Sequence, residues 1–206
     1  MKLLKISALA LMSVGFFACG GSEKLSDDTK NELTEMLEEI ESEVPADWHT
    51  NSTNSYFDID VPGNMEITSD LNQEASLQYK YFEEVGGEGR ENYMIVLMET
   101  KDEIESYDLD EDFTALSYSA MAVEALRDGL DTYEVLTKSP KVEKVNGLDC
   151  VINEMHGSMG DVNVFYKLAV FEGDKAFYQV LCWTIEEQKS DFIGTMDKII
   201  HSFKEK

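Results

Sequence analysis

The stretch that decides the fold is LDCVINEMHGSMGDVNVFYKLAVFEGDKAFYQVLCWT, residues 148–184. It contains three apolar runs separated by two short turn-like segments, SMGD at 158–161 and GD at 173–174. Apolar runs of this length predict strands, and such short connections predict that consecutive strands pair antiparallel. We therefore expect a three-stranded meander formed by residues 148–155, 162–171 and 176–184.

The register of this meander follows from centring its two turns. Cys150 then lies opposite Ala169, and Cys182 lies opposite Phe165. Because side chains alternate along a strand, one face carries Leu148, Cys150, Ile152, Phe165, Ala169, Phe171, Tyr178, Val180 and Cys182. The other face carries Val151, Met155, Val162, Val164, Tyr166, Leu168, Val170, Phe177, Leu181 and Trp183. Both faces are mostly apolar, so we expect the sheet to be covered on both sides, by helices at 109–130 and 185–204.

This register also predicts that Cys150 and Cys182 are free thiols. The two cysteines lie on the strands that flank a common middle strand, and they are offset by four residues along it. Their expected separation is roughly 16 Å, whereas a disulfide needs Cα atoms within about 7 Å. We expect both to be small buried side chains.

The sequence around this stretch continues the same pattern. Asn146-Gly147 is a strong signal for a two-residue hairpin, and the GGEG segment at 86–89 predicts a second hairpin. Apolar residues at three- and four-residue steps predict the two helices, with capping boxes at Asp108/Glu111 and Thr184/Glu187 and a C-terminal cap at Gly129. The other expected strands are residues 56–61, 76–84, 91–100, 131–139 and 141–145.

The predicted fold class is α+β, an antiparallel β-sheet covered by helices on both faces and preceded by a short amphipathic helix at 33–44. The opening strand YFDIDVPG at 56–63, the sheet interrupted by one long helix, and the closing IIHSF at 199–203 resemble the PsbP-like superfamily. That fold is shared by the photosystem II extrinsic PsbP subunit, a Ran-binding nuclear-transport protein and small bacterial lipoproteins. The resemblance implies a domain at 55–206 that binds other proteins, and it carries over no site residue.

The N-terminus indicates where the protein is located. The segment VGFFACGGSE at 14–23 ends an apolar run that is too short to span a membrane and suits a signal peptide. Ala18-Cys19 resembles a bacterial lipobox, so we expect residues 1–18 to be a lipoprotein signal peptide and Cys19 to carry the lipid. The alternative is an ordinary secretory leader with an incidental cysteine. Residues 19–54 are then the lipidated tether, the amphipathic helix and a polar linker at 46–55.

The charge of the chain limits the classes of partner. The 206 residues include 17 Lys and Arg against 42 Asp and Glu, a net charge of −25. The predicted leader has two lysines and no acidic residue, so its removal takes the charge to −27. We expect no nucleic-acid partner, because phosphate binding needs a basic surface. We interpret the excess of acidic residues as promoting solubility at a crowded surface rather than as a means of binding cations.

The sequence predicts no catalytic, cofactor-binding or metal-binding residue, and therefore no cofactor. Cys150 and His156 are about 20 Å apart at strand rise, too far to act together. Asp108, Asp110 and Asp112 mimic the start of a calcium loop, but an EF-hand needs Gly and Glu where this chain has Phe113 and Ser119. We interpret the three carboxylates as caps of the helix that follows. His49 and His201 lie in the linker and the last helix.

Two functions from different classes stay open. The first is a lipid-anchored, non-catalytic binding or adapter module of the bacterial cell envelope, periplasmic or surface-exposed, with the membrane and an envelope protein or glycan as partners. The second is an envelope hydrolase that uses an unidentified carboxylate pair. A pocket with two carboxylates, one of raised pKa, would favour the hydrolase. A filled core with an exposed apolar patch would favour the binding module.

Overall fold

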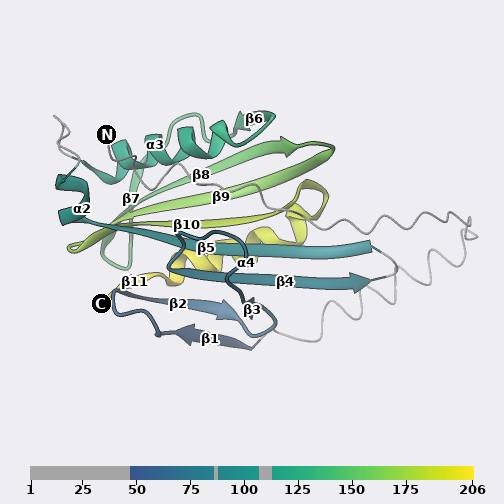
Figure 1. The fold of residues 1–206 in the computed structure, drawn as a ribbon, viewed down its shortest axis with the longest axis horizontal. Helices are drawn as coiled ribbons and strands as arrows, with labels where there is room; N and C mark the ends of the chain where they lie inside the picture. The colour runs from purple at the N-terminus through teal and green to yellow at the C-terminus, as the bar shows by residue number, and fades with distance from the viewer. Residues whose placement is uncertain (1–46, 86–87, 107–112) are drawn as a thin grey trace, which may run out of the picture.

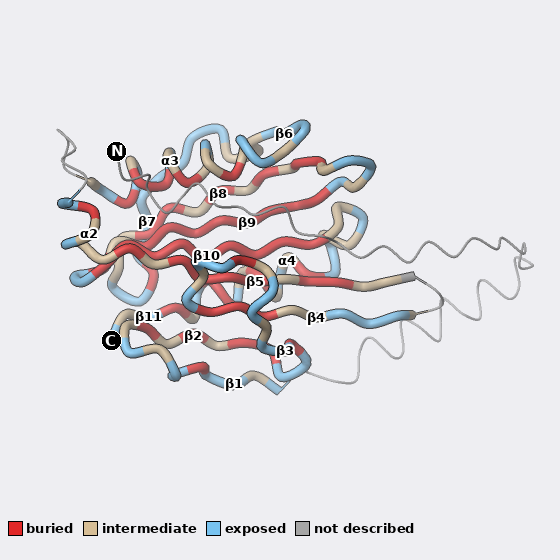
Figure 2. Tube along the Cα trace, in the orientation of Figure 1, coloured by how far each residue is buried: buried red, intermediate tan, exposed pale blue. Residues whose placement is uncertain are grey.

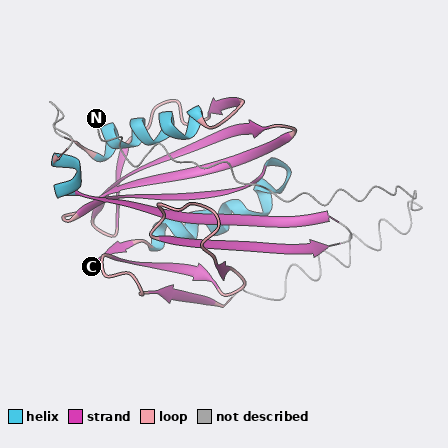
Figure 3. Cartoon of the chain, viewed as in Figure 1, coloured by secondary structure: helices cyan, strands magenta, loops and turns pink. Residues whose placement is uncertain are grey.

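The computed structural model describes residues 47–85, 88–106 and 113–206. Its fold is α+β, with mostly antiparallel sheet (Figures 1 and 3). The larger sheet has eight strands: β3 (Glu66–Ile67), β4 (Leu77–Val85), β5 (Glu88–Thr100), β10 (Ala176–Ile185), β9 (Val162–Glu172), β8 (Leu148–Met159) and β6 (Thr132–Val135) in spatial order, with β7 (Val142–Val145) also paired to β8. The smaller sheet has the order β1 (Trp48–Asn51), β2 (Phe57–Pro62) and β11 (Lys204–Glu205). The predicted lipobox at Cys19, the helix at 33–44 and the acidic stretch at 108–112 lie outside the described residues.

The described residues form three α-helices, α2 (Lys101–Glu105), α3 (Ala115–Asp128) and α4 (Lys189–Ser202), and the 3₁₀-helix η2 (Glu186–Gln188) precedes α4. Helix α3 begins later than the helix predicted at 109–130, so the capping box predicted at Asp108/Glu111 is wrong for this helix. Its N-cap is Thr114, whose hydroxyl accepts from the N–H of Ser117, and Gly129 is its C-cap as predicted. The short α2 was not predicted.

The capping box predicted for the C-terminal helix is wrong. Thr184 lies within β10, where its hydroxyl donates a hydrogen bond to the carbonyl of Glu91 on the adjacent strand β5. The N-cap residue of α4 is Gln188, and its side chain makes no capping hydrogen bond. The hydroxyl therefore contributes to sheet pairing, because strand β10 runs one residue further than its sequence indicated.

Strands β8, β9 and β10 form the predicted meander, but both hairpins differ from the predicted register by two residues. Cys150 pairs with Phe171 rather than Ala169, and Cys182 pairs with Lys167 rather than Phe165. A shift of two leaves every side chain on its predicted face, because side chains along a strand alternate with a period of two.

Each turn has a physical reason for its position. Gly160 has φ 59°, a left-handed conformation that glycine adopts at no steric cost, and this permits a two-residue turn between Met159 and Val162. In the β9–β10 turn, the Glu205 carboxylate accepts hydrogen bonds from the N–H groups of Asp174 and Lys175 at 2.7 and 3.0 Å. That contact centres the turn one residue later than the sequence alone suggests.

The larger sheet separates two apolar clusters, and its middle strands are buried (Figure 2). The α4-side cluster combines alternate residues of β8, β9 and β10 with α4 and with β2 of the smaller sheet; its members include Phe57, Ile59, Met94, Cys150, Phe171, Tyr178, Cys182, Met196, Ile199 and Phe203. The α3-side cluster combines the intervening residues with α3; its members include Ile95, Tyr118, Ala122, Leu126, Met155, Tyr166, Phe177, Leu181 and Trp183.

Polar contacts hold α3 on its side of the sheet. The hydroxyl of Tyr118 donates to the carboxylate of Glu99 on β5, and Gln179 on β10 donates to the same hydroxyl at 3.2 Å. The amide of Asn153 on β8 donates to the hydroxyl of Ser119 at 2.7 Å. These contacts satisfy buried polar groups. They also orient the helix, because they join it to β5, β10 and β8.

Part of the predicted linker is a strand. Residues 48–51 form β1, which pairs antiparallel with β2, so the linker prediction is wrong for these four residues. The hydroxyl of Thr50 donates to the Asp60 carboxylate at 2.6 Å, and the amide of Asn51 donates to the hydroxyl of Tyr79 at 2.8 Å. These polar side chains therefore find tertiary partners that their composition did not reveal.

Candidate functional site

The three histidines lie apart. His49 is on β1, with its ring centroid 6.2 Å from that of Tyr79. His201 is exposed on α4, where its Nδ1 is 2.7 Å from the carbonyl oxygen of Asp197. His156 is on β8, beside Glu186. The described residues contain no group of three or more His, Cys, Asp and Glu side chains that could hold a metal ion.

The two cysteines of the sheet are buried and free, as predicted. Burial raises the pKa of the Cys150 thiol to about 12, with a smaller contribution from the charge of Glu143. Burial also raises the pKa of Cys182. A thiol is nucleophilic only as the thiolate, so these environments suit packing and not catalysis.

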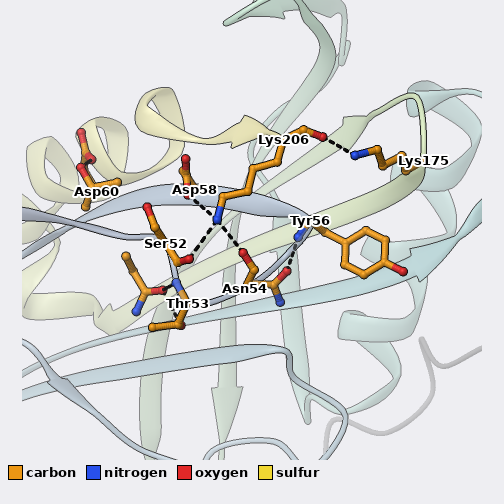
Figure 4. A network of polar contacts seen from close by, with 10 residues as sticks. Ser52, Thr53, Asn54, Tyr56, Asp58, Asp60, Lys175 and Lys206 are labelled. Carbon is orange, nitrogen blue, oxygen red and sulfur yellow. Dashed lines mark hydrogen bonds and ion pairs between the residues drawn. The ribbon is translucent and has the colours of Figure 1, made fainter.

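A polar network surrounds Lys206 at the C-terminus (Figure 4). The ammonium of Lys206 donates to the carbonyls of Ser52 and Asn54 at 2.9 and 2.6 Å, and it pairs with Asp58 at 2.9 Å. The hydrogen bond from Lys206 holds the pKa of Asp58 below its ordinary value. These contacts fasten the end of the chain to the β1–β2 connection, which is a structural role.

A second charged cluster surrounds Lys167, a buried residue of β9. Its ammonium is 3.0 Å from the Glu154 carboxylate on β8 and also pairs with Asp197 on α4. Burial lowers the pKa of Lys167, but hydrogen bonds with Asp197 and Glu154 outweigh this and raise it. The lysine joins two strands and a helix, so its charge serves the packing of α4.

Two hollows in the described surface have the shape of a site. The first, called the polar groove here, has a volume of about 220 Å³ and is lined by Thr132, Tyr133, Glu134, His156, Gly157, Asn163 and Glu186. Nδ1 of His156 is 2.5 Å from Oε2 of Glu186. The second, called the aromatic cleft, has a volume of about 60 Å³ and is lined by Leu71, Glu91, Tyr93, Met159, Val162, Val164, Trp183, Thr184 and Ile185.

The floor of the aromatic cleft is a pair of stacked rings. Tyr93 on β5 and Trp183 on β10 are direct cross-strand partners, with ring centroids 5.2 Å apart and planes inclined by 12°. Both belong to the set of alternate residues on the α3 side of the sheet. Offset stacking of this kind stabilises the pair beyond the area it buries, so the floor is rigid.

The wall beside these rings comes from the segment between β3 and β4, which crosses the α3 side of the sheet (Figure 1). Gln78 on β4 holds this segment: its carbonyl oxygen accepts from the N–H groups of Leu71 and Asn72 at 2.8 and 3.0 Å. The amide of Gln78 donates to the carbonyl of Asn72. Leu71 is thereby placed against the apolar cluster that includes Trp183.

The charged group of the cleft is Glu91, which is only 8% exposed. Gln188 at the end of η2 positions its backbone, since Oε1 accepts from the Glu91 N–H at 2.9 Å and Nε2 donates to the Gly89 carbonyl at 2.6 Å. Burial raises the pKa of the Glu91 carboxyl, and a hydrogen bond donated by the Tyr93 hydroxyl at 2.8 Å opposes this only in part. Burial and the charge of Glu91 raise the pKa of Tyr93 in turn.

Sequence reasoning placed Trp183 on the correct face but did not identify the cleft. Alternation along 91–100 could have placed Tyr93 and Glu91 on one face together. Nothing local indicates that β5 pairs with β10, some ninety residues later, in the register that joins these rings.

Replacing Glu91 with glutamine is expected to change how stability depends on pH. Because the carboxyl pKa is raised in the folded state, the folded protein binds the proton more tightly than the unfolded chain, and stability falls as pH rises above the ordinary value of 4.5 through the raised pKa. The Glu91→Gln variant lacks this loss and gains stability relative to the parent as pH rises. Denaturant unfolding at about pH 4 and about pH 7 measures the difference.

The matched control for that measurement is Glu84→Gln, which removes the same charge from an exposed position on β4. Its stability relative to the parent should change little with pH. If the free energies of unfolding of the parent and the Glu91→Gln variant change in parallel with pH, the Glu91 carboxyl is not desolvated as assigned.

No protein-family model matches the sequence, and no curated protein sequence is similar to it. Its structure is similar to that of the cyanobacterial PsbP protein CyanoP of Synechocystis, with a TM-score of 0.53 and 11% identity over 80% of this chain and 95% of that one. The chain has a PsbP-like fold. The resemblance based on the first strand, the long helix and the closing helix is thereby confirmed.

Two other solved structures are similar to this chain. LpqN of Mycobacterium tuberculosis, described as involved in cell envelope biogenesis, matches with a TM-score of 0.52 and 8% identity over 82% of this chain and 96% of that one. The Ran-binding protein Mog1p of Saccharomyces cerevisiae matches with a TM-score of 0.48 and 11% identity over 78% and 96%. At such identities the similarity to CyanoP and LpqN shows the fold alone. None of the helices in the described part of this chain is long and apolar enough to span a membrane.

Proposed function

We propose that this protein is a lipid-anchored component of the bacterial cell envelope that acts without catalysis, by binding another protein through the aromatic cleft. The lipid on Cys19 supplies the attachment to the membrane. A PsbP-like domain with helices on both faces of its sheet, and with the cleft at the end of the α3 side, supplies the binding surface. The similarity in fold to LpqN, which is described as involved in cell envelope biogenesis, supports this location.

The observation that carries the proposal is the chemistry of the cleft. Six of its nine lining residues have apolar side chains: Leu71, Met159, Val162, Val164, Trp183 and Ile185. Interfaces obtain most of their binding energy from a few side chains buried in such small pockets. The paired strands and the segment that Gln78 holds keep this pocket formed before a partner binds. A pocket that is already formed lowers the free-energy cost of binding.

The hydrolase alternative needs two carboxyl groups in one pocket, one of them protonated. In the described structure these features are separated. The polar groove holds Glu134 and Glu186, whereas the carboxyl whose pKa is raised, Glu91, lies in the aromatic cleft as its one acidic residue. The geometry therefore supports binding better than hydrolysis.

Capture of a partner tests the proposal. The full-length tagged protein is cross-linked in cells and recovered in detergent, beside Val162→Lys, which places a charged chain in the cleft. The matched control is Val142→Lys on β7, a valine that is 47% exposed and outside the cleft. We expect at least about tenfold less partner with Val162→Lys, a loss of roughly 1.4 kcal/mol in binding, and no loss with Val142→Lys.

Two outcomes would contradict the proposal. Equal capture by both lysine variants would show that the cleft is not the binding surface. A cellular phenotype abolished by Glu186→Gln, with folding and partner capture intact, would instead favour the hydrolase.

A further inference from the structure

The carboxyl of Glu91 lies in the aromatic cleft without a basic partner. Among the described residues that line the cleft, Glu91 alone carries a charge. Its side chain accepts one hydrogen bond, at Oε2, from the neutral hydroxyl of Tyr93. The other oxygen, Oε1, has no hydrogen bond to a described residue.

This arrangement is costly for the isolated protein. A carboxylate held against apolar side chains loses hydration, and the cost is offset only by hydrogen bonds or by an opposite charge. Burial is the largest influence on the pKa of Glu91, and no charged group among the described residues opposes it. A cation brought into the cleft would supply the missing interaction.

The size of the cleft restricts what can bring that cation. The cleft has a volume of about 60 Å³. Sites for free small molecules have volumes of roughly 300–1,000 Å³. The cleft therefore suits the end of a single side chain presented by a larger molecule.

The geometry favours an ammonium over a guanidinium. A guanidinium binds best when both carboxylate oxygens are available, but Tyr93 already occupies Oε2 of Glu91. An ammonium is a compact point charge that needs one oxygen. The walls formed by Leu71 and Val162 suit a methylene stem, and the faces of aromatic rings attract cations.

We propose that the aromatic cleft receives a lysine side chain of the partner protein, with its ammonium on Oε1 of Glu91 and its methylene stem against the apolar walls. This inference rests on the proposed function, since it names the group that the partner presents. The net charge of −25 favours approach of a basic surface of that partner.

The probe for this inference is lysine blocked as the N-acetyl, N-methylamide derivative. It is titrated to about 10 mM into the full chain in detergent, and the indole N–H signals of Trp183 and Trp48 are followed by NMR. Trp48 lies on β1, outside the cleft, and serves as the internal control. We expect a saturable shift at Trp183 alone, and at least about tenfold weaker binding of blocked norleucine, which has the apolar chain without the ammonium.

Variants connect the probe to Glu91. Glu91→Gln keeps the shape of the side chain and its acceptor for Tyr93, and it should reduce lysine binding at least about tenfold. Glu84→Gln, the exposed control, should bind as the parent does. The dispersion of the NMR spectrum reports whether each variant is folded.

Each contrary outcome is specific. Equal binding of blocked lysine and blocked norleucine, or no shift at Trp183, would overturn the inference. Tighter binding of blocked arginine would show that the cleft takes a guanidinium instead. If Val162→Lys abolishes partner capture but Glu91→Gln leaves it unchanged, the lysine inference fails while the binding function stands. If no partner is captured by the parent protein, the proposed function fails.

Discussion

Replacing Phe203 with alanine is expected to lower the free energy of unfolding by about 3–5 kcal/mol, the range for removing a large buried aromatic side chain. Phe203 is fully buried at the point where the chain leaves α4 for β11. Its ring centroid is 4.5 Å from that of Phe171, 5.0 Å from that of Tyr178 and 5.4 Å from that of Phe57. One side chain therefore connects both sheets and the last helix.

The reason for so large an effect is that the cavity cannot be filled by a neighbour. The rings around Phe203 are held by β2, β9 and β10, whose backbones are fixed by strand pairing. The alanine variant therefore loses the free energy gained by burying the ring, and a cavity is left in its place. It also loses the contacts between aromatic rings. Because domains of this size are stable by only about 5–15 kcal/mol, a substantial fraction of the total is lost.

Denaturant unfolding followed by circular dichroism measures this effect. The matched control is Phe82→Ala on β4, because Phe82 is 63% exposed, and it should change stability by less than about 0.5 kcal/mol. Comparable losses for the two variants would contradict the central position given to Phe203.

Cys19→Ala is expected to move the protein from the detergent phase to the soluble phase almost completely, with its fold unchanged. One acyl chain binds a membrane only marginally, at roughly 10⁴ M⁻¹, whereas two or three acyl chains hold a protein stably. The acidic chain has little electrostatic attraction to anionic lipid, so we expect the proposed lipid on Cys19 to supply the attachment.

Fractionation of cells that express each form measures this partition. Cys150→Ala is the control, since it removes a buried thiol of the sheet and leaves the predicted lipobox intact. It should remain in the detergent phase. If Cys19→Ala also remains there, the anchor lies elsewhere and the lipoprotein assignment fails.

The sequence predicted the faces of the central strands because alternation is a local property. Phe171 and Cys182 lie on their predicted face although their partners differ from those expected by two residues. The Asn146-Gly147 turn was equally predictable: Asn146 has φ 51° and Gly147 φ 91°, a conformation that few other residue pairs adopt readily. In both cases neighbouring residues carry all the necessary information.

The aromatic cleft was not predictable for the opposite reason. Tyr93 and Trp183 meet because β5 pairs with β10 across a long interval of sequence, and Leu71 reaches them because Gln78 holds its segment. The desolvation of Glu91 arises only when these elements have assembled. A glutamate in a chain with 42 acidic residues has nothing in its own sequence context to distinguish it.

The sequence by itself determined the alternating strands, the Asn146-Gly147 turn, the amphipathic last helix and the acidic character of the chain. These follow from residue types and their spacing, because backbone geometry repeats every two or 3.6 residues. The tertiary structure alone decided that β1 pairs with β2, that Glu205 sets the β9–β10 turn, and that Glu91 is buried beside two stacked rings. Those outcomes depend on which distant surfaces bury one another, and no local periodicity specifies that choice.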